Sequence, residues 1–182
     1  MEAVVGQAGS GRGLRGWYNP LTVGAAIVAV VLFAVGGTVL YQHQSARSRQ
    51  TKEVDTAIAA SQAAYAKGDY QNALGLVGGM AAKATSSGQK ARVYQMEAQA
   101  ANGANKLSDA AQYYTLKHQA DPSTADADAY TLGAIYQRLG QKDKALAQYK
   151  TALQYASTHR NQYGSDAPAI QATIDQLEGK AQ

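Results

Sequence analysis

Apolar residues recur with a helical period over much of the chain, and the pattern is clearest in residues 132–153, LGAIYQRLGQKDKALAQYKTAL. Two stripes at spacings of three and four residues follow one another there. The first is Leu132, Ile135, Tyr136 and Leu139, and the second is Ala145, Tyr149, Ala152 and Leu153. Gly140 lies between the stripes and can adopt the left-handed backbone that ends a helix. The segment predicts a helix, a tight turn and an antiparallel helix.

Two positions in this hairpin are small where the pattern would allow larger residues. Gly133 lies on the first helix and Ala145 on the second. Helix axes that pack closely are about 8–10 Å apart, and a large side chain at the contact would push them apart. We therefore expect the two helices to meet at Gly133 and Ala145, with Tyr136 and Tyr149 filling the space to the side.

The hairpin pattern recurs earlier in the chain. Aligning Gly68 with Gly140 also aligns Ala73 with Ala145, 72 residues apart. Near the midpoint, Ala110 lies 37 residues after Ala73 and 35 before Ala145. A fixed period of this length is typical of helical repeat proteins. The spacing predicts three repeats, at residues 54–87, 91–124 and 126–159.

These residues resemble the tetratricopeptide repeat. LGAIY, residues 132–136, matches the Leu-Gly-x-x-Tyr element of that family, and Ala145, Tyr149 and Ala152 follow at the family's spacing, with Tyr149 in the usual Phe position. The two earlier repeats keep the Ala of the second helix, but they lack the Leu-Gly pair. The resemblance implies an all-α fold, a right-handed α-solenoid of about three helical hairpins.

Tetratricopeptide arrays bind peptides or helices in a concave groove lined by the first helix of each repeat, so the resemblance also implies a set of groove residues. Carried onto this sequence, these are Asp55, Ile58, Gln62, Tyr65, Arg92, Gln95, Gln99, Asn102, Tyr130, Ala134, Gln137 and Arg138. Amides are frequent in this set, and they can donate to and accept from a peptide backbone. The Lys and Asn pair with which chaperone-binding members hold a C-terminal carboxylate is missing.

A second kind of pattern precedes the repeats: residues 21–41 form an uninterrupted apolar run. Twenty-one residues of helix cover roughly the 30 Å of a bilayer core. Trp17 and Tyr18 at one edge and Tyr41 at the other suit the two membrane interfaces. The run predicts a single transmembrane helix at 20–41, after a flexible tail at 1–19 and before a polar stalk at 42–53. A cleaved signal sequence and a buried core helix are the alternatives.

The side of the membrane is weakly indicated. Arg12 and Arg15 precede the run, while Arg47, Arg49 and Lys52 follow it, so the basic residues nearly balance. A long C-terminal domain can be translocated regardless of such charges, and we expect it to be extracytoplasmic. Ala25 and Ala29 form a small-xxx-small pair that can seat a second membrane helix.

The last segment, residues 160–182, predicts a capping helix and a tail. Asp166 can cap the helix and Pro168 suits its first turn. Ile170, Ile174 and Leu177 form an apolar stripe that would close the open end of a repeat array.

Candidate chemistry is sparse. The chain has no Cys, which removes thiol nucleophiles and disulfides, and its three His are far apart. The Asp residues at 121, 126 and 128 do not form a calcium loop, and we interpret them as helix-capping charges. The net charge of +4 comes from dispersed basic residues, which argues against nucleic acid. The sequence therefore predicts no enzyme, no metal and no cofactor.

The predicted function is that of a membrane-anchored scaffold that binds a protein partner in the groove, as an accessory subunit of a bacterial envelope, secretion or pilus-type complex. One alternative is a holdase for exported unfolded chains. Another is a stalk that self-associates through its transmembrane helix.

Overall fold

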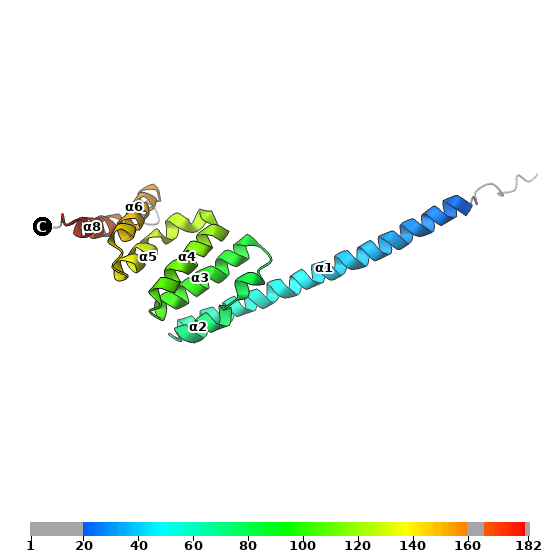
Figure 1. The fold of residues 1–182 in the computed structure, drawn as a ribbon, viewed down its shortest axis with the longest axis horizontal. Helices are drawn as coiled ribbons and strands as arrows, with labels where there is room; N and C mark the ends of the chain where they lie inside the picture. Colours follow the sequence, from blue (N-terminus) through cyan, green and yellow to red (C-terminus); the bar gives the residue numbers. More distant parts are fainter. Residues whose placement is uncertain (1–19, 160–165, 181–182) are drawn as a thin grey trace, which may run out of the picture. The chain divides into compact units, whose positions relative to one another are not determined.

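In a computed structural model of the chain, the backbone is described for residues 20–159 and 166–180, and the side chains for residues 40–159 and 166–180. All regular structure in these ranges is helical, which confirms the all-α prediction. In chain order the elements are α1 (Pro20–Ala66), α2 (Tyr70–Val77), the 3₁₀ helix η1 (Met80–Ala82), α3 (Ser87–Gly103), α4 (Leu107–Ala120), the 3₁₀ helix η2 (Pro122–Thr124), α5 (Ala125–Arg138), α6 (Lys142–Thr158) and α8 (Ala167–Glu178) (Figure 1).

The predicted transmembrane segment lies mostly outside the described side chains. A search of the described residues finds no helix that has both the length and the apolar character needed to cross a bilayer. Trp17 and Tyr18 are outside the described residues, and Tyr41 is exposed on α1. The membrane segment therefore stays a prediction from the sequence.

The chain divides into two units, residues 1–46 and 47–182, and the packing described below belongs to the second. This unit begins within the segment predicted to be a polar stalk. Thr51 Oγ1 lies 2.8 Å from Thr85 Oγ1, and the Lys83 ammonium lies 2.5 Å from the Glu53 carboxylate. Residues 47–53 thus contact the connection that leads into α3.

Packing in the second unit runs from each helix to the next in the chain. Helix α2 packs on α3, α3 on α4, α4 on α5, α5 on α6 and α6 on α8 (Figure 1). Buried side chains form several small clusters along this series, and neighbouring elements share each of them. Such nearest-neighbour packing lets each hairpin bury its apolar faces against the hairpins beside it.

The same turn occurs three times. Gly68, Asn105 and Gly140 each adopt a left-handed backbone, with φ of 78°, 61° and 71°. In all three, the next residue donates its N–H to a carbonyl in the preceding helix: Asp69 to Ala64, Lys106 to Ala101, and Gln141 to Tyr136. This bond satisfies a helix carbonyl that would otherwise be unpaired. Asn can adopt this conformation at lower cost than most residues, and so the middle turn forms without glycine.

Each turn is followed, five residues later, by an alanine that is fully buried. These are Ala73, Ala110 and Ala145. Twelve residues before each alanine, on the preceding helix, lies a second small buried residue: Ser61, Ala98 or Gly133. Ser61 Oγ donates to the Ala73 carbonyl over 2.8 Å, which joins the two helices directly. Small residues therefore occur at the helix contact in every hairpin, including the two that lack the Leu-Gly pair.

At Gly133 the close neighbour is an aromatic ring. A Cβ added to Gly133 would lie 2.9 Å from Cδ1 of Tyr149, nearer than real Cβ atoms approach other carbons. Tyr149 thus lies directly on the glycine, whereas the sequence placed it to the side. Leu132 and Ala152 are buried as expected, and Tyr136 is half-buried.

Helix α8 occupies the position predicted for the capping helix. Ile170 and Ile174 are buried in the cluster that α5 and α6 share, and Leu177 packs against it. Asp166 is the N-cap residue, but its side chain makes no capping hydrogen bond. The predicted N-cap position is therefore confirmed, whereas the capping hydrogen bond from the carboxylate is not found.

Candidate functional site

The candidate site is the face on which the predicted groove residues lie. Four of them are on α1, four on α3 and four on α5. Eleven are exposed or half-buried. Ile58 is only 2 % exposed and packs with Val54, Val77, Val93 and Met96, so it belongs to the core. The assignment of Ile58 to the groove is corrected, because a partner cannot reach its side chain.

Charged residues of this face link neighbouring helices. Arg92 Nη1 on α3 donates to Asp55 Oδ1 on α1 over 3.1 Å, and Gln89 Nε2 donates to the same oxygen over 3.2 Å. Arg138 on α5 donates to Asn102 Oδ1 over 3.0 Å and to Asn105 Oδ1 over 2.7 Å. These contacts join α1 to α3 and α3 to α5, but exposed pairs of this kind add little stability.

Other groove residues are held by aromatic contacts. Tyr149 donates from its hydroxyl to Gln137 Oε1 over 2.8 Å, and its ring meets the Tyr130 ring edge-on at 5.7 Å. Tyr65 makes a similar edge contact at 5.2 Å with Tyr70. The side chain of Ala134 packs against the cluster that α5, α6 and α8 share.

Three amides of the face remain. Gln62, Gln95 and Gln99 make no side-chain hydrogen bond within the described part of the chain, and all three are exposed or half-buried. Each amide offers two donor hydrogens and one acceptor oxygen. They provide unpaired hydrogen-bonding groups between residues that the structure holds in place.

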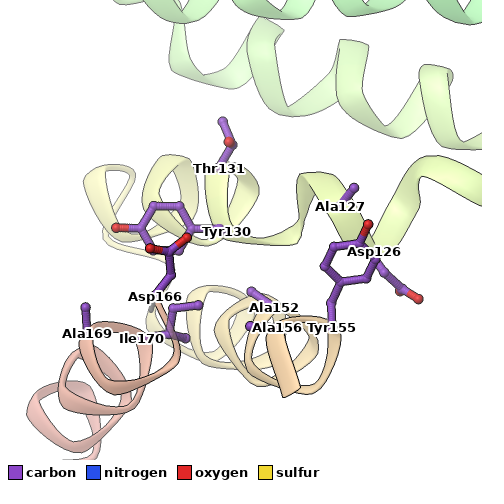
Figure 2. A pocket seen from close by; sticks show the side chains of 10 residues that line it. All are labelled: Asp126, Ala127, Tyr130, Thr131, Ala152, Tyr155, Ala156, Asp166, Ala169 and Ile170. Atoms are coloured by element: carbon purple, nitrogen blue, oxygen red, sulfur yellow. The ribbon is translucent and has the colours of Figure 1, made fainter. Parts of the chain in front are cut away.

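A pocket of about 400 Å³ lies at the α8 end of this face, between α5, α6 and α8. It is lined by Asp126, Ala127, Tyr130, Thr131, Ala152, Tyr155, Ala156, Asp166, Ala169 and Ile170. Figure 2 shows Tyr130 and Tyr155 at opposite ends of the pocket, with Ala152 and Ala156 between them on α6. The sequence had placed Tyr130 in the groove, but it did not indicate that Tyr155, Asp126 and Asp166 line the same pocket, because this depends on how α5, α6 and α8 pack.

One of the Asp residues interpreted as capping charges has a different role. The Asp128 carboxylate on α5 lies 2.5 Å from the Lys117 ammonium and 3.0 Å from His118 Nε2, both on α4. Burial by itself would raise the pKa of Asp128, but the hydrogen bonds from His118 and Lys117 outweigh that effect, and the pKa is lowered. Asp121, by contrast, does cap, since its side chain accepts from the Ser123 N–H.

A buried carboxyl on α3 was also missed. Glu97 is 4 % exposed, and its Oε2 has no hydrogen-bond partner among the described residues. Burial raises the pKa of Glu97 to about 7, and a hydrogen bond from the Gly79 backbone opposes the shift only in part. Nothing in the spacing of the sequence distinguishes Glu97 from a solvent-exposed glutamate.

No protein-family model and no curated protein matches the chain. Among the described residues, no group of three His, Cys, Asp or Glu is arranged to hold a metal ion.

Proposed function

We propose that the chain is a membrane-anchored scaffold of the tetratricopeptide type, and that the face on α1, α3 and α5 docks a protein partner. One observation carries this proposal: Gln62, Gln95 and Gln99 present amides without a hydrogen-bond partner among the described residues, beside an Asp55–Arg92 ion pair and an Arg138 side chain bonded to Asn102 and Asn105.

The chemistry of this face favours a polypeptide ligand. An extended or helical segment offers backbone carbonyls and N–H groups at regular intervals, and glutamine amides can bond to either. Asp55 and Arg92 compensate each other's charge, whereas Arg138 donates only to the neutral amides of Asn102 and Asn105 and keeps a positive charge on this face. We expect the amides to hold the partner's backbone while other contacts select its sequence.

The apolar run at 21–41 anchors the scaffold in this proposal, with the repeats on the extracytoplasmic side. Confinement near a bilayer raises the effective concentration of any membrane partner, so that weak contacts suffice. An accessory subunit of an envelope, secretion or pilus-type complex fits these properties.

The test is site-specific photocrosslinking in intact membranes. A photoreactive amino acid replaces Gln62 or Gln99 on the proposed docking face, and Lys142, exposed at the start of α6, serves as the matched control. We expect one adduct of a single mass from Gln62 and Gln99 and none from Lys142. The partner identified from that adduct should then co-purify with the full chain at a fixed ratio.

Two other results would overturn the proposal. An adduct that forms only from Lys142 would place the docking surface elsewhere. A broad series of adducts with unrelated proteins, together with suppression of client aggregation by the purified chain, would make it a holdase.

A further inference from the structure

Arg138 is held on the docking face by two asparagine side chains and not by an acid. Its Nη1 donates to Asn102 Oδ1 over 3.0 Å and its Nη2 donates to Asn105 Oδ1 over 2.7 Å. The ion pairs among the described residues do not include Arg138. A guanidinium keeps its charge in proteins, so an oriented and exposed positive charge lies on this face.

The residue at the middle turn is suited to this contact. Asn105 adopts the same left-handed backbone, at φ 61°, as Gly68 and Gly140 do at the equivalent turns. Glycine adopts this backbone at lower cost than any residue with a side chain. A glycine would therefore form the turn more easily, but it could not bond to Arg138. The side chain of Asn105 distinguishes this turn from the other two, and it orients the guanidinium.

The groups that remain free in this cluster are hydrogen-bond donors. The amide NH₂ groups of Asn102 and Asn105 make no hydrogen bond within the part of the chain that the structure describes, and the same is true of the remaining N–H groups of Arg138. Guanidinium and amide NH₂ groups donate and do not accept. A ligand that suits them is an acceptor, and the positive charge favours one that is ionised.

The charges close by do not cancel that of Arg138. A hollow of about 330 Å³ lies beside Asn105, and its charged lining residues, Lys106 and Asp109, have opposite signs. Helix α6 begins four residues after Arg138 and runs for about 25 Å before the described part of the chain is interrupted at 160–165. The cluster therefore keeps about one unit of positive charge.

We propose that this cluster binds an acidic side chain, Asp or Glu, of the docked partner. The carboxylate accepts two N–H groups of Arg138 in parallel, a geometry that guanidinium favours. Asn102 and Asn105 are positioning residues, because they hold the guanidinium before the ligand arrives and so reduce the ordering that binding requires. The identity of the ligand as a partner's side chain rests on the proposed function, since Arg138 and Asn102 belong to the docking face.

The test uses the full chain in uncharged detergent micelles, with ¹³C-labelled alanine methyl groups. The probe is a nine-residue Gly/Ser peptide with a central glutamate and with acetylated and amidated ends, and its twin has glutamine at the same position. Ala104, between the two asparagines, is the reporter. We expect the glutamate peptide to shift the Ala104 methyl signal saturably, and the Kd of the glutamine peptide to be about fourfold higher.

Three variants locate the charge and the positioning. Arg138→Gln should reduce the ratio of the two Kd values to about one, whereas Lys142→Gln, the same charge change at an exposed residue outside the face, should leave the ratio unchanged. Asn105→Gly keeps a turn of the kind that Gly68 and Gly140 form, but it frees the guanidinium. It should reduce the ratio to about twofold.

Equal Kd values for the two peptides in the parent chain would overturn this proposal, and so would equal effects of Arg138→Gln and Lys142→Gln. An unchanged ratio in Asn105→Gly would overturn the role of Asn105. If the acid site alone fails, crosslinks from Gln62 and Gln99 still capture a single partner. If the docking proposal alone fails, the glutamate peptide still binds more tightly than its twin while those crosslinks capture nothing.

Discussion

Single small residues set the distance between paired helices in this protein. Gly133 is covered by the ring of Tyr149, and Gly103 of α3 is covered in the same way by Tyr70 of α2, whose Cδ1 would lie 2.5 Å from an added Cβ. One contact is within a hairpin and the other is between hairpins. Both depend on the missing side chain, because a ring cannot lie flat on a helix where a Cβ projects.

Gly133 gives the first prediction. Gly133→Ala should destabilise the domain by about 1–2 kcal/mol, because the strain of moving the buried Tyr149 ring exceeds the gain in helix propensity. Gly133→Leu should destabilise the domain more than Gly133→Ala does. Chemical denaturation of the full chain in micelles, followed by circular dichroism at 222 nm, measures both.

Gly75 is the control, since it lies inside α2 with no atom near the position of an added Cβ. Gly75→Ala should stabilise the domain by about 0.5–1 kcal/mol. If Gly133→Ala stabilised the domain as much as Gly75→Ala, the close contact of Gly133 with Tyr149 would be refuted.

Glu97 gives a prediction about pH. Its pKa is raised from 4.5 in a free side chain to about 7 in the folded chain. Between these values the folded state binds more protons than the unfolded state, so this group makes the free energy of unfolding fall as pH rises from 4.5 to 7. Above pH 7 its contribution is constant and unfavourable.

Glu97→Gln keeps the shape of the side chain and removes its charge. At pH 8 the variant should be more stable than the parent chain by on the order of 2 kcal/mol, and the difference should vanish near pH 4.5. Unfolding titrations at several pH values measure this. Glu53→Gln, at an exposed carboxylate, should keep the parent's pH slope, and an unchanged slope in Glu97→Gln would contradict the prediction.

Whole helices were easier to predict from the sequence than the contacts between them. The stripe at Leu132 and Ile135 and the turn at Gly140 are local patterns, and the structure has both. The turn at Asn105 left a weaker signal, because Asn adopts this backbone less often than Gly does. The role of Asp128 left no signal, since its partners on α4 come from a separate helix.

The contact of α4 with α5 gives the third prediction. The Lys117 side chain is 6 % exposed and pairs with Asp128. Asp128→Asn should therefore cost about 2–4 kcal/mol, because it leaves a buried ammonium without its counter-charge. Chemical denaturation of the parent chain and of the variant measures this difference in the free energy of unfolding.

Two further variants distinguish the contribution of the Lys117–Asp128 ion pair to stability from that of the helix dipole. Asp126→Asn removes an acid from the same first turn of α5, and it should cost less than about 0.5 kcal/mol. Adding Lys117→Met to Asp128→Asn should restore most of the stability, since neither charge then remains. A loss in Asp126→Asn as large as that in Asp128→Asn would show that the dipole, and not the ion pair, is responsible.

At the scale of the whole molecule, the proposed membrane anchor at 21–41 would confine docking to the membrane surface. Replacing both Val30 and Val31 with Arg would cost about 5–7 kcal/mol at the centre of a spanning helix. We expect the parent chain to remain in the membrane fraction after alkaline carbonate extraction and this variant to be released. The paired control places one Arg at Ser48, beyond the run, and should stay with the membrane.

The orientation can be tested directly because the chain has no cysteine of its own. Ser10→Cys places one thiol in the tail before the apolar run, and Ser108→Cys places one on the exposed surface of α4. If the tail is cytoplasmic and the repeats are outside, a membrane-impermeant maleimide labels Ser108→Cys in intact cells and labels Ser10→Cys only after lysis. The opposite pattern would put the docking face in the cytoplasm, and partners would then have to be sought there. Labelling of both thiols before lysis would mean that the run at 21–41 does not separate two compartments, and the anchored scaffold would be refuted.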